Sequence, residues 1–318
     1  MTKPSELGRI EGAIACDAYC SLDDGVYHAV VLGRDGAITD LAYERSGAPR
    51  GREVLGRVPG ARDVTAFWSL VSNLRNVITF TESGEILHFT RSGAGLWTRA
   101  VQRNVAGARR IAGYDDHHHG IVLTSAGETT DQPFHTVTPE AERMFRQTLE
   151  ADLARLGKTT TKEAIATMSR PQGEPEKPIV VGTFPAAVDI GALWANDPNR
   201  FVILAEASGA ITEVGYGMLQ DATRRELARI KEPVAVSGCY AGHSEGPQRP
   251  EDLRAGKWVV ALARAGELHV IRYGTDAPSV ETAVMVKGAV DAACFRTPER
   301  ELHGVLVASD EVLDVPIA

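Results

Sequence analysis

Three aspartates occupy the same place in an internal repeat of this 318-residue chain: Asp63, Asp189 and Asp291. Each follows a Gly-Ala or Ala-Ala pair at the same interval, in the segments GARD, AAVD and GAVD. If the repeats surround a common axis, these side chains converge, and converging carboxylates repel one another unless a cation or a proton is present. Two chemistries fit: a Ca²⁺ site with an all-oxygen shell, or acid and base groups acting on a polar substrate.

Three arginines near these acids could supply the counter-charge. Arg62 precedes Asp63, and Arg109 and Arg110 occupy the corresponding segment of the third repeat. We therefore take the three aspartates as catalytic candidates and the three arginines as candidate ligand-binding residues. A structural role is favoured over this hypothesis, because an aspartate at the entry to a strand commonly accepts hydrogen bonds from backbone amides.

A histidine-rich loop offers a second site. The segment DDHHHG at 115–120 contains His117, His118 and His119, and His243 lies on a later irregular loop. These four histidines are candidate metal ligands, since a zinc site needs three or four donors that converge in space.

A structural interpretation of this loop is favoured over the metal site. His119 aligns with His28 and His303, each directly before the second strand of its repeat. A residue that recurs at one position of a repeat indicates packing within the repeat rather than one specialised metal centre.

The four cysteines do not form a recognisable metal motif. Cys16 and Cys20 lie four residues apart on one predicted strand, so their Cα atoms would be about 13 Å apart, too far for a disulfide. No Cys-x-x-Cys pair occurs. The N-terminal segment is polar, and no apolar run approaches the length of a membrane helix. We expect reduced thiols in a cytoplasmic protein.

The elements that position these residues come from a repeat of about 47 residues. Each unit begins with a short strand of small residues, continues through two strands joined at a tight turn, and ends in a fourth strand. The aligned residues at the position of the aspartates are Ala15, Asp63, Arg110, Asp189, Val236 and Asp291. The aligned residues four places later are Tyr19, Phe67, Tyr114, Leu193, Tyr240 and Phe295. Because Leu193 replaces an aromatic residue there, this position favours packing between units over a stacking platform.

Six such units predict an all-β fold, a six-bladed β-propeller of four-stranded antiparallel blades. The last unit lacks a fourth strand, and SELGRIE at the start of the chain matches one, so we expect the N-terminal strand to close the ring. Residues 1–318 then form a single propeller domain. Helical spacing of apolar residues predicts a two-helix insertion with a linker at 138–178, within blade 3.

The units resemble those of lectin-like propellers such as the fucose-binding lectins of bacteria and fungi, over all six repeats. That resemblance implies sugar bound between neighbouring blades by an arginine, an acid and an aromatic residue. Arg45 and Arg91 align after the third strand, whereas blades 3, 4 and 6 have no counterpart. Lactonases of the gluconolactonase type are also similar and imply an axial cation, although their asparagine ligands have no match here.

The composition of the chain and the motifs that it lacks argue against several classes of function. A net charge of −8 argues against nucleic acid or an anionic membrane as the main partner. No Walker loop, GxGxxG, GxSxG or HExxH segment occurs, so phosphate-loop, dinucleotide, serine-elbow and zincin chemistries have no support. We expect one asymmetric small-molecule site, in an enzyme of hydrolase, lyase or cyclase type. A non-catalytic interaction scaffold and a sugar-binding propeller are the alternatives, and the insertion is a candidate lid or homo-oligomer contact.

Overall fold

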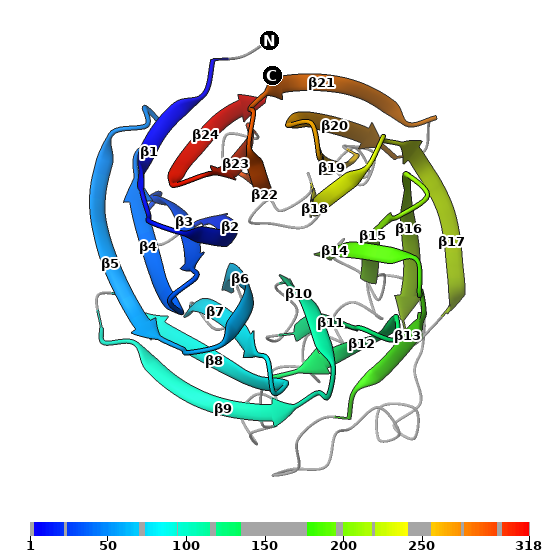
Figure 1. The fold of residues 1–318 in the computed structure, drawn as a ribbon, viewed down its shortest axis with the longest axis horizontal. Helices are drawn as coiled ribbons and strands as arrows, with labels where there is room; N and C mark the ends of the chain where they lie inside the picture. The colour runs from blue at the N-terminus through cyan, green and yellow to red at the C-terminus, as the bar shows by residue number, and fades with distance from the viewer. Residues whose placement is uncertain are drawn as a thin grey trace, which may run out of the picture.

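The computed structural model describes residues 3–21, 24–69, 74–93, 95–114, 119–134, 177–194, 200–217, 220–240, 256–274, 277–297 and 301–317. Within these ranges, 24 strands form six four-stranded antiparallel sheets around a central axis (Figure 1). The predicted six-bladed propeller is therefore confirmed. The two helices predicted within 138–178 fall on residues outside the described ranges. Among the described residues, no helix has the length and apolar character needed to cross a membrane.

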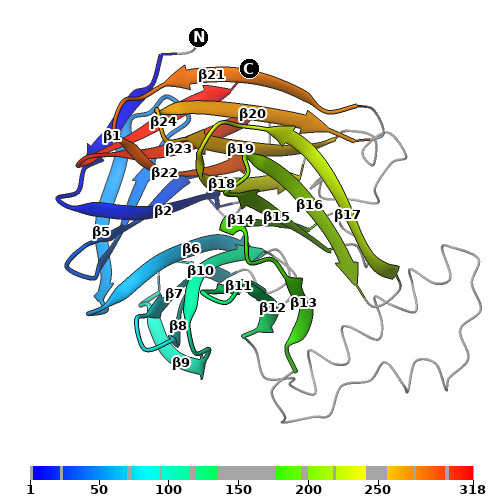
Figure 2. The ribbon, with the colours of Figure 1, turned by 45° about the vertical axis from the view of Figure 1, so that its right-hand side comes forward.

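Five blades run outward from the axis in chain order, blade 6 takes its outermost strand from the start of the chain, and we number the blades from the one that begins with β2 (Figures 1 and 2). The innermost strands are β2 (Ala13–Cys20), β6 (Ala61–Ser69), β10 (Ala108–Tyr114), β14 (Ala187–Trp194), β18 (Pro233–Tyr240) and β22 (Ala289–Arg296). The second strands are β3 (Tyr27–Gly33), β7 (Leu74–Thr81), β11 (His119–Thr124), β15 (Arg200–Glu206), β19 (Lys257–Ala263) and β23 (Leu302–Ala308). The third strands are β4 (Ala37–Tyr43), β8 (Glu85–Ser92), β12 (Glu128–Pro133), β16 (Ala210–Gly217), β20 (Glu267–Tyr273) and β24 (Glu311–Ile317). The outermost strands are β5 (Pro49–Arg57), β9 (Thr98–Asn104), β13 (Ile179–Thr183), β17 (Gln220–Arg229), β21 (Ser279–Met285) and, in blade 6, β1 (Ser5–Arg9).

The N-terminal strand closes the ring. β1 pairs antiparallel with β24, with Ser5 opposite Asp314 and Arg9 opposite Glu311. The Arg9 guanidinium lies 2.8 Å from the Glu311 carboxylate across this pair. The predicted closure is confirmed, and it removes the open edge that blade 6 would otherwise expose.

The core lies between adjacent blades. The second strands are the most deeply buried, and Val30, Ile121 and Val260 expose none of their surface. The outermost strands are largely exposed and polar, as in β5. A strand packed on both faces must be apolar on both, which explains the continuous apolar runs in the second strand of each unit. This packing makes the innermost strands a rigid frame around the axis.

A bulge near the start of every innermost strand aims one side chain at the axis. The register with the second strand shifts there, between Ala61 and Asp63 in blade 2, and likewise in the other five blades. A bulge inserts one unpaired residue and redirects the next side chain. The residues that follow the bulges form what we term the axial ring: Ala15, Asp63, Arg110, Asp189, Ala235 and Asp291.

In blade 5 the structure shifts the innermost strand by one residue relative to the sequence alignment. The alignment placed Val236 in the axial ring and Tyr240 among the recurring aromatic residues, but the register gives Ala235 and Cys239 instead. The cause is Glu232, whose φ of 47° is the left-handed conformation that glycine adopts at this turn elsewhere, as in Gly60 with 76°. Glu232 therefore holds the glycine position, and the strand starts one residue earlier than its sequence suggests.

Candidate functional site

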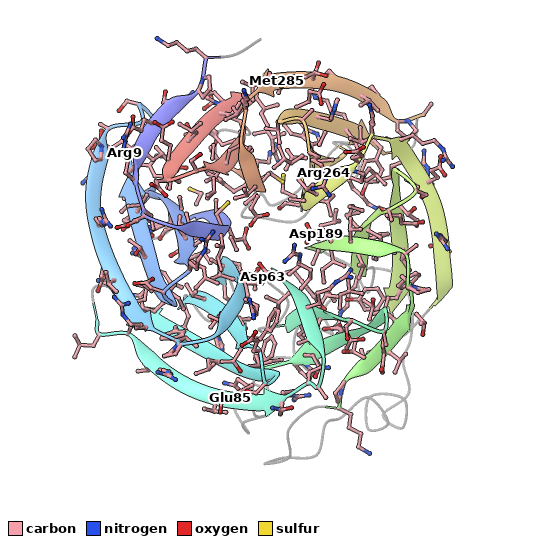
Figure 3. All side chains as sticks on the ribbon, viewed as in Figure 1. Arg9, Asp63, Glu85, Asp189, Arg264 and Met285 are labelled. Carbon is pink, nitrogen blue, oxygen red and sulfur yellow. The ribbon has the colours of Figure 1, made fainter. Side chains whose placement is uncertain are left out.

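The axial ring brings together the three aspartates singled out in the sequence. Asp63 and Asp189 lie beside the central axis in Figure 3, and Asp291 is close enough to both for their charges to act on it. Arg110 is the cation of this group, with its Nε 2.8 Å from Asp189 Oδ1. Three carboxyl groups thus share one guanidinium in a largely buried setting.

The ring aspartates also bind backbone amides. Asp63 accepts a hydrogen bond from the amide of Val64 in its own strand, and Asp291 one from Ala292. Each ring aspartate also accepts a hydrogen bond from a backbone amide of the next blade. The pairs are Asp63 with the Ile111 amide (3.0 Å), Asp189 with the Val236 amide (2.7 Å) and Asp291 with the Cys16 amide (2.7 Å). The structural role considered for these residues is present, and it extends across blade boundaries.

Two residues further along each strand, a second ring continues this pattern. It comprises Asp17, Thr65, Ala112, Gly191, Ser237 and Ala293. Asp17 accepts from the Ala66 amide at 2.8 Å, Thr65 Oγ1 from the Gly113 amide at 2.6 Å, and Ser237 Oγ from the Cys294 amide at 3.2 Å. Together with the axial ring, these bonds give every one of the blade boundaries a polar side-chain link at the axis.

The surroundings raise the pKa values of both the ring acids and their cation, Arg110, for different reasons. Burial raises the pKa of Asp189 to about 7, against the effect of Arg110. Burial, reinforced by Asp63 and Asp189, raises the pKa of Asp291 well above its usual range. Burial would lower the pKa of Arg110, but the surrounding carboxylates raise it. The ring therefore holds protons near neutral pH while its guanidinium stays charged.

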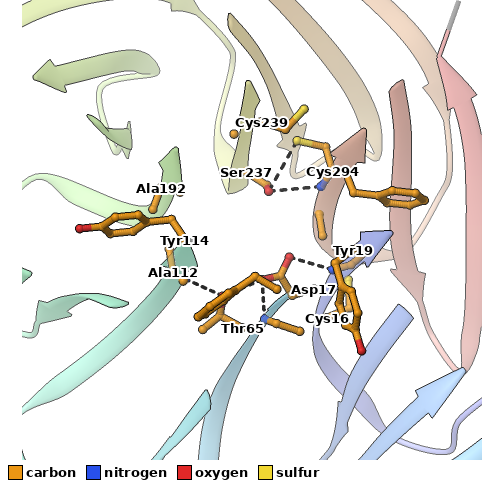
Figure 4. A pocket seen from close by; sticks show the side chains of 18 of the residues that line it. Cys16, Asp17, Tyr19, Thr65, Ala112, Tyr114, Ala192, Ser237, Cys239 and Cys294 are labelled. Carbon is orange, nitrogen blue, oxygen red and sulfur yellow. Dashed lines mark hydrogen bonds between the residues drawn. The ribbon is translucent and has the colours of Figure 1, made fainter. Parts of the chain in front are cut away.

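A cavity of about 230 Å³ lies on the axis and is lined by all six innermost strands (Figure 4). The ring aspartates lie at one end of its lining, and Trp68, Arg296 and Thr297 at the other. Asp17, Thr65 and Ser237 supply polar groups between them. Burial raises the pKa of Asp17 to about 6, although the Thr65 hydroxyl, 2.6 Å away, opposes the rise.

The recurring aromatic rings belong to blade packing rather than to a stacking platform. Tyr19 stacks on His28 with centroids 4.7 Å apart. Tyr114 donates its hydroxyl hydrogen to Asp131 at 2.7 Å, away from the axis. These residues also line the axial cavity, but these contacts of Tyr19 and Tyr114 lie within their own blades.

The other two arginines singled out in the sequence make their described bonds outside the axial ring, although the charge of Asp189 acts on Arg109. Arg62 is the extra residue of the bulge in blade 2, and its exposed side chain pairs with Glu82. Arg109, the bulge residue of blade 3, donates to the backbone carbonyl of Ala187. Adjacent side chains on a strand point to opposite faces, so Arg62 turns away where Asp63 turns inward.

The recurring histidines pair with aspartates inside their own blades. His28, His119 and His303 each place Nδ1 near a carboxylate of the third strand: Asp40 (2.9 Å), Asp131 (2.8 Å) and Asp314 (2.9 Å). All six side chains are buried. His117, His118 and His243 lie outside the described residues.

Within the described ranges, no group of three or more His, Cys, Asp or Glu side chains is placed to hold a metal ion. Asp63 and Asp291 each use both oxygens for backbone amides. The donor set at the axis fits hydrogen bonding better than the open oxygen shell that Ca²⁺ requires.

Sequence reasoning missed the second ring. Asp17, Thr65 and Ser237 lie two residues after the axial ring and share its side of the strand, which is a usable signal. The chemical identity of the residue differs among the three blades, so no recurring letter marks the position.

A second cavity of about 270 Å³ lies between blades 2 and 3. It is lined by Leu74, His88, Thr90, Thr98, Arg99, Ala100, Gln102 and Phe134. Elsewhere, Arg91 lies 2.6 Å from Glu53 of blade 1 and 5.8 Å from the Trp97 ring, which joins an arginine, an acid and an aromatic residue at one blade boundary.

Comparison with known proteins shows the fold. No protein-family model and no curated protein matches the sequence. Solved structures do match: AofleA from Arthrobotrys oligospora has a TM-score of 0.64 and 10% identity, covering 100% of this chain and 86% of that one. The fucose-specific lectin from Aleuria aurantia has a TM-score of 0.61 and 10% identity, with 99% and 94% covered. A gluconolactonase from Xanthomonas campestris has a TM-score of 0.52 and 12% identity, with 100% and 90% covered. The chain is thus a six-bladed β-propeller similar in fold to both a fucose-specific lectin and a gluconolactonase.

Proposed function

We propose that the chain binds a small polar molecule in the axial cavity and carries out acid–base chemistry on it, with Asp17 and Asp189 as the proton carriers. The observation behind this proposal is that one cavity holds two carboxyl groups, the half-buried Asp17 and the buried Asp189, with pKa values of about 6 and about 7. Buried acids that titrate near neutral pH are typical of general acid–base sites.

The lining indicates the class of ligand. Three ring carboxyls face one guanidinium, and Asp17 adds a fourth acid, so the cavity is rich in hydrogen-bond acceptors. Such a site favours a molecule with amino or hydroxyl donors over an anion. A volume of about 230 Å³ equals the share of about eight water molecules, which suits a compact molecule.

The reaction class that fits is hydrolysis, elimination or cyclisation, each of which needs only proton transfer from the protein. Mass spectrometry of small molecules that co-purify with the protein identifies the ligand. With that ligand, we expect Asp189→Asn to retain binding within a few-fold and to lose at least about 100-fold in turnover, the usual scale of acid–base catalysis. Arg62→Met, on the outer surface, is the matched control. Binding without turnover in the unaltered protein would instead identify a non-catalytic binding propeller.

A second candidate is sugar binding in the cavity between blades 2 and 3. This cavity offers Arg99, Gln102 and Thr90 together with the Phe134 ring, and a structural neighbour is a fucose-specific lectin. Titration with fucose and other monosaccharides tests it. Loss of binding in Arg99→Ala, with Asp189→Asn unaffected, would place the sugar there rather than on the axis.

A further inference from the structure

All four cysteines line the axial cavity, but they have two different settings. Cys16 and Cys20 both lie on β2, and their Sγ atoms face the backbone carbonyls of Val305 and Ser21. Cys239 and Cys294 come instead from neighbouring blades, on β18 and β22. The second pair therefore spans the boundary between blades 5 and 6.

The two thiols of this pair are in contact. Cys239 packs against the core cluster that contains the buried Cys294, and the Cys294 side chain is within hydrogen-bonding reach of the Cys239 thiol. Figure 4 shows their sulfur atoms beside each other, with Ser237 Oγ 3.7 Å from Cys294 Sγ and 3.2 Å from the Cys294 amide. Cys294 is 5% exposed, whereas Cys239 is partly exposed. A small molecule in the cavity meets Cys239 first.

We propose that Cys239 and Cys294 are a modification site, which hydrogen peroxide converts into a disulfide between blades 5 and 6. The Cys239 sulfur attacks one peroxide oxygen, the O–O bond breaks, and the other oxygen leaves as water after taking a proton, giving a sulfenic acid. The Cys294 sulfur then attacks this sulfur, the S–O bond breaks, and a second water leaves as the S–S bond forms. Two thiols lose two electrons in total, and one peroxide becomes two waters.

The surroundings of the Cys239 thiol determine how fast the disulfide forms. The contact with Cys294, and then burial, raise the pKa of the Cys239 thiol well above its usual range. Because the thiolate is the attacking form, formation is slow near neutral pH and accelerates as the pH rises. The reaction does not depend on the ligand proposed for the cavity.

The test treats the purified full chain with millimolar peroxide at pH 7 and pH 9, blocks remaining thiols under denaturing conditions, and maps peptides by mass spectrometry without reduction. We expect the free thiols to fall from four to two, a cross-linked peptide pair containing Cys239 and Cys294, faster formation at pH 9, and full reversal by dithiothreitol. The double variant Cys16→Ser with Cys20→Ser is the matched control and should form the same cross-link.

In Cys239→Ser the cross-link should disappear, and Cys294 should react with a sulfenic-acid probe at most slowly. Four unchanged thiols after prolonged treatment of the unaltered protein would overturn the proposal. So would a cross-link involving Cys16 or Cys20, or conversion of Cys239 to sulfinic acid without any cross-link.

Discussion

Asp131, which is buried, and Asp291, which is half-buried, are both inner carboxyl groups at blade boundaries, yet their surroundings affect them in opposite ways. Asp131 lies on β12 and accepts from Tyr114 Oη (2.7 Å), Arg200 Nη1 (3.1 Å) and His119 Nδ1 (2.8 Å). Burial opposes ionisation of Asp131, but His119 and Arg200 outweigh it and lower its pKa. Burial also raises the pKa of Asp291, and there two other carboxyls add to the rise instead of reversing it. The partners, rather than burial itself, decide whether an inner acid is ionised.

A similar set of partners surrounds an acid one blade further on. Glu213 on β16 accepts from Lys257 Nζ at 2.7 Å and from the Tyr273 hydroxyl at 2.8 Å, both from blade 5. Asp131 likewise accepts from a tyrosine of the next blade, Tyr216, at 3.2 Å, so an acid that meets a base and a tyrosine of the next blade recurs away from the axis. On the axis, by contrast, acids outnumber the base. The outer acids are paired with bases of the next blade, whereas the axial acids share a single guanidinium within the axial ring.

The largest expected effect on stability comes from removing the charge of Asp131, which pairs with Arg200. Asp131→Asn leaves the buried Arg200 without its carboxylate, and we expect a loss of about 3–5 kcal/mol in the free energy of unfolding, measured with urea. Asp40→Asn is the matched control, because Asp40 pairs with His28 and with no arginine in the described contacts. A greater loss in Asp40→Asn than in Asp131→Asn would contradict the distinction.

Removing the axial cation should cost less and depend on pH. Arg110→Met takes away the only guanidinium among the described side chains of the axial ring, and we expect a loss of about 2 kcal/mol at pH 8, discounted for the partly exposed Arg110 side chain. The loss should shrink at pH 5, where the acids accept protons. Arg62→Met, whose side chain is exposed, should change the free energy of unfolding by less than about 0.5 kcal/mol at both pH values.

The two kinds of acid should also respond to pH in opposite directions. Asp189 has a raised folded-state pKa, so its contribution to stability is fully present below about pH 4 and is lost as the pH rises towards about 7. The unfolding free energy of Asp189→Asn relative to the unaltered protein should therefore improve from pH 5 to pH 7, by at most about 1.4 kcal/mol per pH unit. Asp131 has a lowered pKa, so the deficit of Asp131→Asn should shrink as the pH falls below about 4. If the free energies of unfolding of the two variants, relative to the unaltered protein, changed with pH in the same direction, the contrast between the two acids would be wrong.

The smallest effect concerns the second ring. Thr65→Val removes the hydroxyl that donates to Asp17 and accepts from the Gly113 amide, and we expect a loss of about 1 kcal/mol. The pKa of Asp17 should rise above about 6, because the Thr65 hydroxyl lowers it now. Carboxyl chemical shifts from NMR titration report this change, with the exposed Thr98→Val as a control that should leave Asp17 unchanged.

The repeat predicted the blades because each unit carries its own strand pattern and five of the six carry a glycine at the turn between the second and third strands. Gly36 shows why that glycine is needed: its φ is 80°, and a Cβ there would lie 2.2 Å from the Val58 carbonyl oxygen. The convergence of the three aspartates followed from the same repeat. The register of blade 5 did not, because Glu232 adopts a glycine-like conformation that nothing in its local sequence marks.

Side-chain contacts between blades could not be predicted from the sequence. The ion pair of Arg110 with Asp189 and the contact of Cys239 with Cys294 join residues of different units. Such contacts depend on how neighbouring sheets pack, which no local period encodes. The second ring was missed for the related reason that three different residue types make equivalent bonds.

The pairing of β1 with β24 makes the backbone a circle with one interruption, and the opening could be moved by circular permutation. A permutant that joins the present ends through a linker and starts at β6 would keep all six sheets, but none would contain strands from both ends of the chain. Its new opening, between blades 1 and 2, would then be held by side-chain packing and by bonds such as that from the Ala66 amide to Asp17. Comparing its unfolding rate with that of the natural order would measure how much the shared sheet contributes to kinetic stability.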